Sequence, residues 1–356
     1  LTVTAGASIG PGILTAIGEA MGDPSIPLRL ITGVGDVDSA LPSQAMWELS
    51  RLDPESEEFI SRFDEFLVEF GSRGPNEWDL ISDVWETTPS LALSLIDVMR
   101  KQGPEGDPAA RAAAGVAERE ALTEQIRTAL AGDPEALAQF EMGLSSAHTY
   151  LAGRERAKTN IIKVLHEIRM AFRELARRHG IDNTEFHMLL DDELDAFVNS
   201  PGDFHSRLSQ RAIEYEALFD LVPPFIILAA APPMSEWARR GGSGVAVSDS
   251  GDVLHGVPGC PGEVTGTARV ILDPSDPMAL EPGDILVAPF TDPAWTPLFV
   301  PAAGVVVNVG AQVSHAIIVS RELGIPCVVS VTGATDAIPD GATITVDGGS
   351  GTVTVH

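Results

Sequence analysis

The sequence predicts a multi-domain protein in which a mostly α-helical N-terminal domain is followed by a domain of short strands. Two observations support this fold class. Residues 1 to about 222 repeat helix signals, namely Asp-Pro starts followed by apolar residues at a spacing of three and four. Beyond Gly241 the chain changes to glycine-rich turns between short β-branched runs. With 356 residues, the chain is long enough for two domains with sizeable cores.

The helical half carries its apolar residues mainly on helix faces. In residues 56–70 the phenylalanines recur at helical spacing, which is more typical of a core than of a cofactor site. We expect helices over residues 42–52, 56–70, 108–130, 134–151, 154–179 and 204–221, with one more around 191–194.

The boundary between the two halves is predicted at the flexible composition Arg239-Arg240-Gly241-Gly242-Ser243-Gly244. We therefore expect a helical domain over residues 1–240, a linker over 241–256 and a second domain over 257–356. In that second domain we expect strands over residues 266–272, 284–289, 305–309, 327–331, 342–347 and 352–355.

Charge and apolar runs exclude several classes of partner. The formal net charge is -28, and from Val257 onward only Arg269 and Arg321 are basic. No basic stripe is present to neutralise a phosphate backbone, so nucleic-acid binding is not expected. No apolar run reaches the roughly 18 residues of a membrane span, so we expect no membrane partner.

The cysteine pattern and the N-terminus indicate a reducing compartment. Cys260 and Cys327 are isolated and form no CxxC pair, so we expect no metal site in this chain. We read Cys327 as a core residue. The sequence begins at Leu1 without a signal peptide. A cytoplasmic location is therefore predicted, in a chain trimmed at its start.

The most informative segment is VSHAIIVSRELGIP, residues 313–326. It places His315 in the first turn of a short amphipathic helix, directly after a buried-looking strand. Ser314 is expected to cap this helix, and Gly324 to end it. Free backbone N–H groups at a helix start favour an anion, and a neutral imidazole is a good nucleophile toward phosphorus. His315 is thus a candidate phosphoryl carrier, although a lone histidine there is more commonly a capping or packing residue.

Three further motifs precede this histidine in order: PGCPGEVTGTARV (258–270), PGDILV (282–287) and TDPAWTPLF (291–299). With them, residues 257–356 resemble the swivelling phosphohistidine domain of the phosphoenolpyruvate-utilising enzymes. The resemblance implies a β/β/α fold in which His315 is the catalytic phosphoryl carrier. Gly310, Ser314 and Arg321 are assigned as residues that support the phosphohistidine.

The helical half resembles the central domain of rifampicin phosphotransferase-like proteins. The resemblance lies in FGSRGPNEWDL (70–80) and in several later segments. We take Arg73, Glu77, Asp79 and Arg154 as a candidate acceptor site, in which an arginine binds a phosphoryl oxygen and a carboxylate accepts the acceptor's proton. Two alternatives remain open: Arg73 only pairs with Glu77 or Asp79, and Arg154 belongs to a salt-bridged helix face.

Some positions depart from the pattern of these families. Ser72 stands where histidine is common, and Asp83-Val84 stand where Pro-Arg is common. These departures put the acceptor chemistry in doubt and imply a different acceptor, or none. Ala311 replaces the second glycine of a usual Gly-Gly pair, a change small enough to keep a close backbone approach.

The resemblance implies a phosphotransferase (dikinase) of which this chain is one part. ATP and Mg²⁺ would bind an ATP-grasp domain, upstream or separate, that charges the histidine. Two alternatives are a ligase of the prodigiosin-condensing type that uses the same relay, and a non-catalytic phosphocarrier or binding subunit. The partner is expected to be a small-molecule acceptor with a hydroxyl group.

The helical half contains many large apolar side chains, which favours a hydrophobic acceptor. A small anionic acceptor would instead need a tight cage of arginines. The residues behind this expectation are Phe59, Phe63, Phe66, Trp78, Trp85, Met142, Met170 and Met188.

Overall fold

The computed structural model covers most of the chain. The residues outside its described part are 1, 24, 33, 35–37, 39, 225–226, 228, 240–246, 275–279, 293–294 and 312–313, together with the side chains of 2–8, 105, 111 and 114. The first part of the predicted linker, residues 241–246, therefore lies outside the described residues.

The chain divides into two compact units. The first comprises Leu1–Glu77, Asp83–Ile162 and Val247–His356, and the second comprises Trp78–Ser82 and Lys163–Ala246. This division differs from the predicted domains, because part of the helical half shares an apolar core with the strands and so clusters with them. The sequence-based boundaries at residues 240 and 257 stay a prediction.

The first unit contains most of the helices that precede the sheet in the sequence. They are α1 (Thr2–Met21), α2 (Ile26–Leu30), α3 (Leu41–Ser50), α4 (Glu57–Phe70), α5 (Ser90–Arg100), α6 (Pro108–Leu130) and the first part of α7 (Pro134–His179). The α4 start is capped by Ser56, whose side chain accepts from the Phe59 N–H at 3.1 Å. The two helices predicted over 134–151 and 154–179 are one continuous helix, since Gly153 alone does not interrupt it. Helices α1, α2 and α5 were not predicted.

The second unit is built around the C-terminal part of α7. It adds α8 (Asn183–Phe186), α9 (Leu194–Asn199), α10 (His205–Ala217) and the paired strands β1 (Leu221–Val222) and β2 (Ala238–Arg239). Its core is aromatic, with Phe186, Phe197 and Phe204 meeting edge to face at centroid distances of 5.8 Å. The second unit also contains the short 3₁₀ helices η2 (Asp191–Glu193), η3 (Pro201–Asp203), η4 (Leu218–Asp220) and η5 (Met234–Glu236), whereas η1 (Pro104–Gly106) belongs to the first unit.

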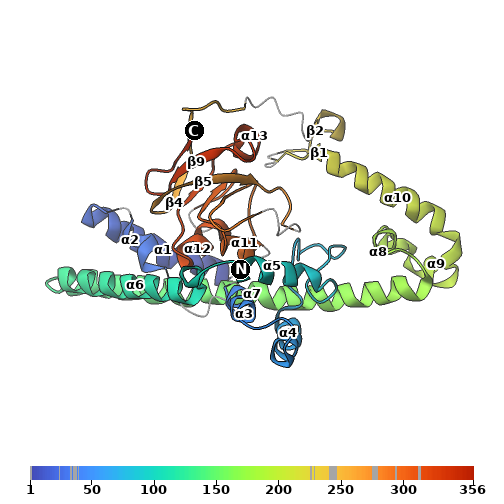
Figure 1. The fold of residues 1–356 in the computed structure, drawn as a ribbon, viewed down its shortest axis with the longest axis horizontal. Helices are drawn as coiled ribbons and strands as arrows, with labels where there is room; N and C mark the ends of the chain where they lie inside the picture. The colour runs from blue at the N-terminus through green and yellow to red at the C-terminus, as the bar shows by residue number, and fades with distance from the viewer. Residues whose placement is uncertain are drawn as a thin grey trace. The chain divides into compact units, whose positions relative to one another are not determined.

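The C-terminal region of the first unit is a mixed eight-stranded sheet, which confirms the predicted fold class (Figure 1). Its order is β3-β10-β9-β5-β6-β7-β8-β4, and β5 to β8 are parallel. The strands are β3 (Val253–His255), β4 (Val257–Cys260), β5 (Glu263–Val270), β6 (Ile285–Ala288), β7 (Gly304–Val307), β8 (Cys327–Val329), β9 (Thr343–Asp347) and β10 (Thr352–Val355). Helices α11 (Thr296–Phe299), α12 (His315–Glu322) and α13 (Ala334–Ala337) follow β6, β7 and β8.

The two outermost strands of this sheet are neighbours in the sequence. Only Gly256 separates β3 from β4, so the sheet must curl until its two edges meet. The Gly256 N–H donates to the Gly351 carbonyl at 2.8 Å, and a Cβ at this position would lie 2.5 Å from the Val329 carbonyl oxygen. Glycine is therefore required at this junction.

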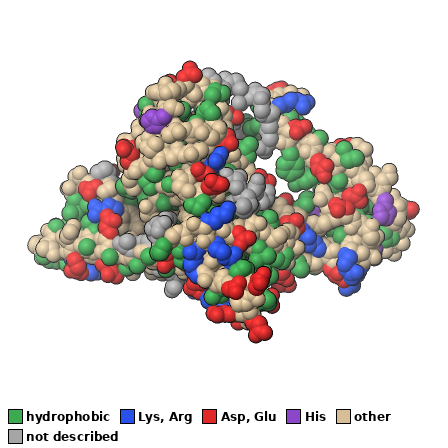
Figure 2. Space-filling view, in the orientation of Figure 1, with side chains coloured by type: hydrophobic (Ala, Val, Ile, Leu, Met, Phe, Trp, Pro, Cys, Tyr) green, Lys and Arg blue, Asp and Glu red, His purple; other side chains and the backbone are tan. Residues whose placement is uncertain are grey.

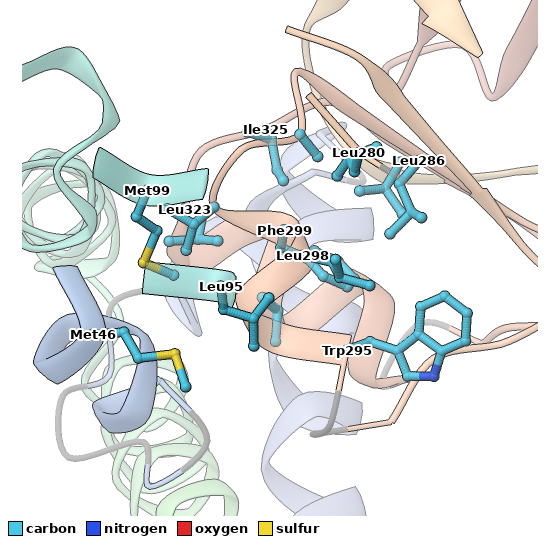
Figure 3. Close-up of a cluster of buried hydrophobic side chains, with 14 of the residues drawn as sticks. Met46, Leu95, Met99, Leu280, Leu286, Trp295, Leu298, Phe299, Leu323 and Ile325 are labelled. Carbon is cyan, nitrogen blue, oxygen red and sulfur yellow. The ribbon is translucent and has the colours of Figure 1, made fainter. Parts of the chain in front are cut away.

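Side chains of the parallel strands alternate between two cores. Ile285 and Val287 face one core and Leu286 faces the other, as the two-residue period of a strand demands. The core that contains Leu286 also contains Met46 of α3 and Met99 of α5. Figure 3 shows these methionines pointing toward the side chains of α11 and of the segment after α12. The helices and one face of the sheet thus form a continuous apolar interior.

Both cysteines are free and buried, Cys260 at the end of β4 and Cys327 in β8. Burial raises the pKa of the Cys260 thiol to about 11 and that of Cys327 to about 12, so both stay protonated. The core role predicted for Cys327 is confirmed. In the part of the chain that the structure describes, no helix combines the length and apolar character needed to cross a membrane. Acidic side chains are scattered over the face shown in Figure 2.

Replacing Met99 by alanine tests the shared core. Met99 is fully buried between α5 and the sheet, so we expect the free energy of unfolding to fall by about 2–5 kcal/mol. Denaturant unfolding followed by circular dichroism measures this loss. Val68→Ala on the exposed face of α4 is the matched control and should change stability by less than about 0.5 kcal/mol. A loss as small as that of the control would contradict the shared core.

Candidate functional site

His315 lies where the loops after two parallel strands meet. It is the first residue of α12, the helix after β7, while Thr291 and Thr296 follow the neighbouring strand β6. The carboxyl ends of adjacent parallel strands share one edge of a sheet, which brings these loops together. The N-cap residue Ser314 has the expected extended backbone (ψ 158°), but its side chain makes no capping hydrogen bond. The predicted side-chain cap is therefore wrong.

Both ring nitrogens of His315 are engaged by threonine hydroxyls. The Thr296 Oγ1 lies 3.0 Å from Nε2, and the Thr291 Oγ1 lies 3.2 Å from Nδ1. A hydroxyl can donate or accept, so either neutral tautomer of the imidazole is satisfied. The edge-to-face ring of Phe299, at a centroid distance of 5.8 Å, fixes the ring plane from the side.

The surroundings of His315 keep its imidazole neutral. Burial lowers the pKa of His315 well below its ordinary value, and the positive charges of Lys158, Arg73 and Arg154 lower it further. At neutral pH one ring nitrogen thus keeps a free electron pair, which is the nucleophilic form. The same three cations attract an anionic group placed on the ring.

Arg73 is held in place by a buried ion pair. Its Nε donates to the Glu77 Oε2 at 2.7 Å, and its Nη1 donates to the Thr159 Oγ1 at 3.2 Å. Burial raises the pKa of Glu77, Arg73 opposes that rise, and Asp292 adds to it. Of the two alternatives for Arg73, pairing with Glu77 is therefore observed, and the guanidinium also acts electrostatically on His315.

Arg154 and Lys158 share one carboxylate on α7. Glu155 is buried, and its Oε1 lies 3.3 Å from the Lys158 Nζ and 3.9 Å from the Arg154 Nη1. The salt-bridged face that the sequence left open is thus present. Arg154 and Lys158 are four residues apart, a spacing that places both on one helix face and indicates their shared role.

Sequence reasoning missed four members of this site as site residues: Lys158, Thr291, Thr296 and Asp292. The motif TDPAWTPLF contains Thr291, Asp292 and Thr296, but only the adjacency of β6 and β7 brings the two threonine hydroxyls to the histidine.

Asp79 belongs to the second compact unit, where its carboxylate orders a turn. Its Oδ1 accepts from the Ile81 N–H at 3.1 Å, and its Oδ2 accepts from the Ser82 hydroxyl at 2.9 Å. Its backbone carbonyl accepts from Arg169 at 3.0 Å. These contacts give Asp79 a structural function within its own unit, and its role toward an acceptor stays a prediction.

The three supporting residues predicted near the phosphohistidine lie at different places. The Gly310 carbonyl accepts from the Ser330 hydroxyl at 2.5 Å, and a Cβ at Gly310 would lie 2.8 Å from Val329. Ser314 adjoins His315, whereas Arg321 lies six residues along α12, about 9 Å further. The Arg321 guanidinium donates to the Gly259 carbonyl at 3.0 and 2.8 Å.

The aromatic residues predicted to line an acceptor pocket are mostly core. Phe59, Phe63, Phe66 and Trp85 are buried in the core shared with the sheet. The ring centroids lie 5.9 Å apart for Phe59 and Phe63, 6.0 Å for Phe63 and Phe66, and 5.5 Å for Phe66 and Trp85. Met142 is exposed on α7.

A metal ion held by side chains alone needs several of them close together. Among the described residues, no three His, Cys, Asp or Glu side chains come together in a way that could hold a metal ion. Binding of ATP and Mg²⁺ by another domain remains a prediction.

Comparison with known families identifies two segments. Residues 280–351 match the PEP-utilising enzyme mobile domain, and residues 49–155 match the rifampicin phosphotransferase fourth domain. The chain carries both of these domains. The mobile domain supplies His315 and its threonines, and the fourth domain supplies Arg73, Glu77 and Arg154.

Individual relatives agree with this assignment. An uncharacterised protein of Mycobacterium bovis is 32% identical over 86% of this chain and 33% of its own length. A rifampicin phosphotransferase of Streptomyces sviceus is 30% identical over 86% of this chain and 36% of its own length. The prodigiosin synthesizing transferase PigC of Serratia marcescens is 31% identical, with coverages of 85% and 34%. The chain thus spans about a third of the length of these relatives.

The buried pair Arg73–Glu77 should show strong coupling. Removing either partner leaves the other charge buried, so Arg73→Leu and Glu77→Gln should each cost about 3–5 kcal/mol of stability. The double variant should cost less than the sum of the two by about 0.5–3 kcal/mol, measured by denaturant unfolding. The solvent-screened pair Glu174–Arg177 is the control and should show little coupling. Additive losses at Arg73 and Glu77 would refute the buried pair.

The lowered pKa of His315 predicts a stability loss in acid. Below the ordinary value of 6.5 the unfolded chain takes up a proton at this histidine and the folded chain does not, so stability falls as pH drops. Between pH 7 and pH 5 this contribution amounts to up to about 2 kcal/mol. We expect His315→Gln to lose correspondingly less stability than the native chain over this interval. Equal losses in both proteins would show that His315 titrates normally. The difference between the two also removes the contribution of His148, whose pKa is lowered by burial.

Proposed function

We propose that His315 accepts a phosphoryl group and passes it to a hydroxyl group of a small acceptor. The observation that carries this proposal is the buried, neutral imidazole of the mobile domain facing Arg73, Arg154 and Lys158. Neutrality supplies the electron pair that attacks phosphorus. The three cations then lower the free energy of the phosphoryl group once it is on the ring.

The charge balance of the site suits an anionic intermediate. Three cations, Arg73, Arg154 and Lys158, accompany three carboxylates, Glu77, Glu155 and Asp292, so these side chains balance in charge. The cations are the charges that act on the His315 ring. A phosphoryl group carries about −1.5 to −2 charges near neutral pH. The empty form is therefore tolerated without a bound anion, and the phosphorylated form gains electrostatic stabilisation.

The transfer proceeds in two displacements at phosphorus. In the first, a ring nitrogen of His315 bonds to phosphorus and the donor's P–O bond breaks, with the electron pair leaving on the donor oxygen. In the second, the acceptor hydroxyl oxygen bonds to phosphorus, the N–P bond breaks, and the ring nitrogen recovers its electron pair. The hydroxyl proton passes to a carboxylate, for which Glu77, with its raised pKa, is the candidate base.

The threonines act as positioning residues in this scheme. Whichever ring nitrogen carries the phosphoryl group, the threonine at the other nitrogen holds the ring orientation and tautomer. Thr291 and Thr296 approach from the loop after β6, so they move with the mobile domain rather than with the acceptor side.

The wider reaction follows from the similarity to rifampicin phosphotransferases. An ATP-grasp domain, fused or separate, would charge His315 from ATP with Mg²⁺, and movement near residues 241–256 would carry it to the acceptor. We expect a hydrophobic hydroxyl acceptor and a cytoplasmic location. If the acceptor site has been lost, the chain would act as a non-catalytic phosphocarrier subunit.

The similarity to PigC favours a second candidate, a ligase that uses the same histidine relay. The two functions differ in their products. A phosphotransferase yields a stable phosphorylated acceptor, whereas a ligase releases inorganic phosphate and joins two substrates. Identification of the products by mass spectrometry, with the ATP-grasp partner present, distinguishes them.

Chemical phosphorylation tests the carrier function on this chain alone. Phosphoramidate should place one phosphoryl group on His315, stable in base and lost in acid as expected for a P–N bond, and His315→Ala should accept none. Loss of one charge-assisted hydrogen bond in Lys158→Met should slow labelling about tenfold or more. Intact-protein mass spectrometry follows the label.

The control for this experiment is Lys163→Met, which removes an exposed lysine from the same helix and should label at the native rate. Equal labelling of His315→Ala and the native chain would refute the carrier function. Native-like labelling of Lys158→Met would refute the role of the cation.

A further inference from the structure

A cavity of the first compact unit lies away from His315. Its volume is about 740 Å³, and its walls come from α2, α6, β4 and the end of α12. The wall residues include Leu28, Val257, Pro261 and Arg321, and none of the cations or threonines around His315 lines it. A volume of this size accommodates an organic molecule of substantial size.

Arg321 brings a buried positive charge to this cavity, and the charge of the adjacent Glu322 raises the pKa of its guanidinium. Arg321 is only 6% exposed. Its two hydrogen bonds both go to the Gly259 carbonyl. Among the described residues it forms no ion pair with a carboxylate. Its thiol neighbours Cys260 and Cys327 stay protonated and supply no negative charge.

A buried charge is costly unless its hydrogen bonds are satisfied, and the hydrogen bonds of Arg321 go to one backbone carbonyl rather than to a carboxylate. Burial lowers the pKa of Arg321 only to about 10, so the group remains charged at neutral pH. The other arginine of the cavity shows the usual arrangement, because the Arg29 Nε lies 2.7 Å from the Glu118 Oε1. A guanidinium has five N–H donors, and a backbone carbonyl uses only some of them.

The remaining walls select the rest of the ligand. Leu28, Val257, Pro258 and Pro261 give an apolar surface, and Ser25 and Thr32 of the helical side add hydroxyl groups. An apolar body would fill the space between these walls, and an anionic end would meet Arg321. This is the general form of a small-molecule site, mostly apolar with one or two polar anchors.

We propose that this cavity is a second ligand site, which binds a small organic anion with an apolar body and one carboxylate that accepts hydrogen bonds from Arg321. The ligand would contact α2 and α6 on one side and β4 and α12 on the other, so it would favour the arrangement in which these elements pack together. The proposal goes beyond phosphoryl transfer and does not depend on it.

Binding of a matched pair of probes tests this site. We would titrate the chain with 4-phenylbutyrate and with 4-phenylbutan-1-ol, which differ in charge at one end, and measure affinity by ligand-observed NMR and calorimetry. The carboxylate should bind at least about tenfold more tightly than the alcohol, the difference expected from one charge-assisted contact. Equal affinities, or no binding of either probe at millimolar concentration, would overturn the proposal.

Variants locate the bound probe. Leu28→Trp fills the cavity from the half-buried face of α2 and should abolish binding while the unfolding midpoint stays near native. Arg321→Met should remove the preference for the carboxylate. Lys158→Met should bind like the native chain, because Lys158 faces His315 and not this cavity.

Native-like binding by Leu28→Trp would overturn the site even if Arg321→Met fails to fold. Loss of binding in Lys158→Met would place the probe at the reaction site and overturn it too. Failure of phosphoramidate labelling at His315 would leave this binding result unaffected, so the two proposals fail separately.

Discussion

The apolar core that joins α3 and α5 to one face of the sheet is the interaction on which the site depends. Met46 and Met99 from the helices meet Leu298 and Phe299 of α11 in this core. Phe299 in turn packs edge to face against His315. The same packing that stabilises the unit therefore sets the position of the reactive ring. It also brings the ring within electrostatic range of Arg73 and Lys158.

Burial and positive charge act on the histidine in the same direction. Each favours the unprotonated ring, the form that the proposed phosphoryl transfer requires, whereas a cation alone at an exposed histidine would be screened by water. The buried carboxylates Glu77 and Glu155 keep the cations from being isolated charges in the absence of a phosphoryl group. Under the proposed function, a site built in this way is stable empty and becomes more favourable when phosphorylated.

Local sequence signals were sufficient to predict many of the elements, but not helices α1, α2 and α5 and not all of the site. The start of α12 at His315, the extended backbone before it and the strand β7 follow from neighbouring residues, and the structure has them. The threonine contacts depend on the pairing of β6 with β7, which no local pattern specifies. The predicted Ser314 cap was wrong because a residue at an N-cap position need not form a side-chain hydrogen bond. The predicted helix break near Gly153 was wrong because one glycine in a helix costs only about 1 kcal/mol.

The short helix α12 relates the two proposed sites. His315 stands at its N-terminal end under the cations of the helical region, and Arg321 stands near its C-terminal end beside the cavity. A helix of this length behaves as a rigid rod, so a ligand that fixes Arg321 against α2 and α6 also fixes His315 against Arg73 and Lys158. Because Arg321 is anchored to β4 through Gly259, this coupling passes through the mobile domain and needs no change in the helical region. Occupation of the second site would therefore slow the departure of the histidine from the acceptor side without altering the chemistry at the ring.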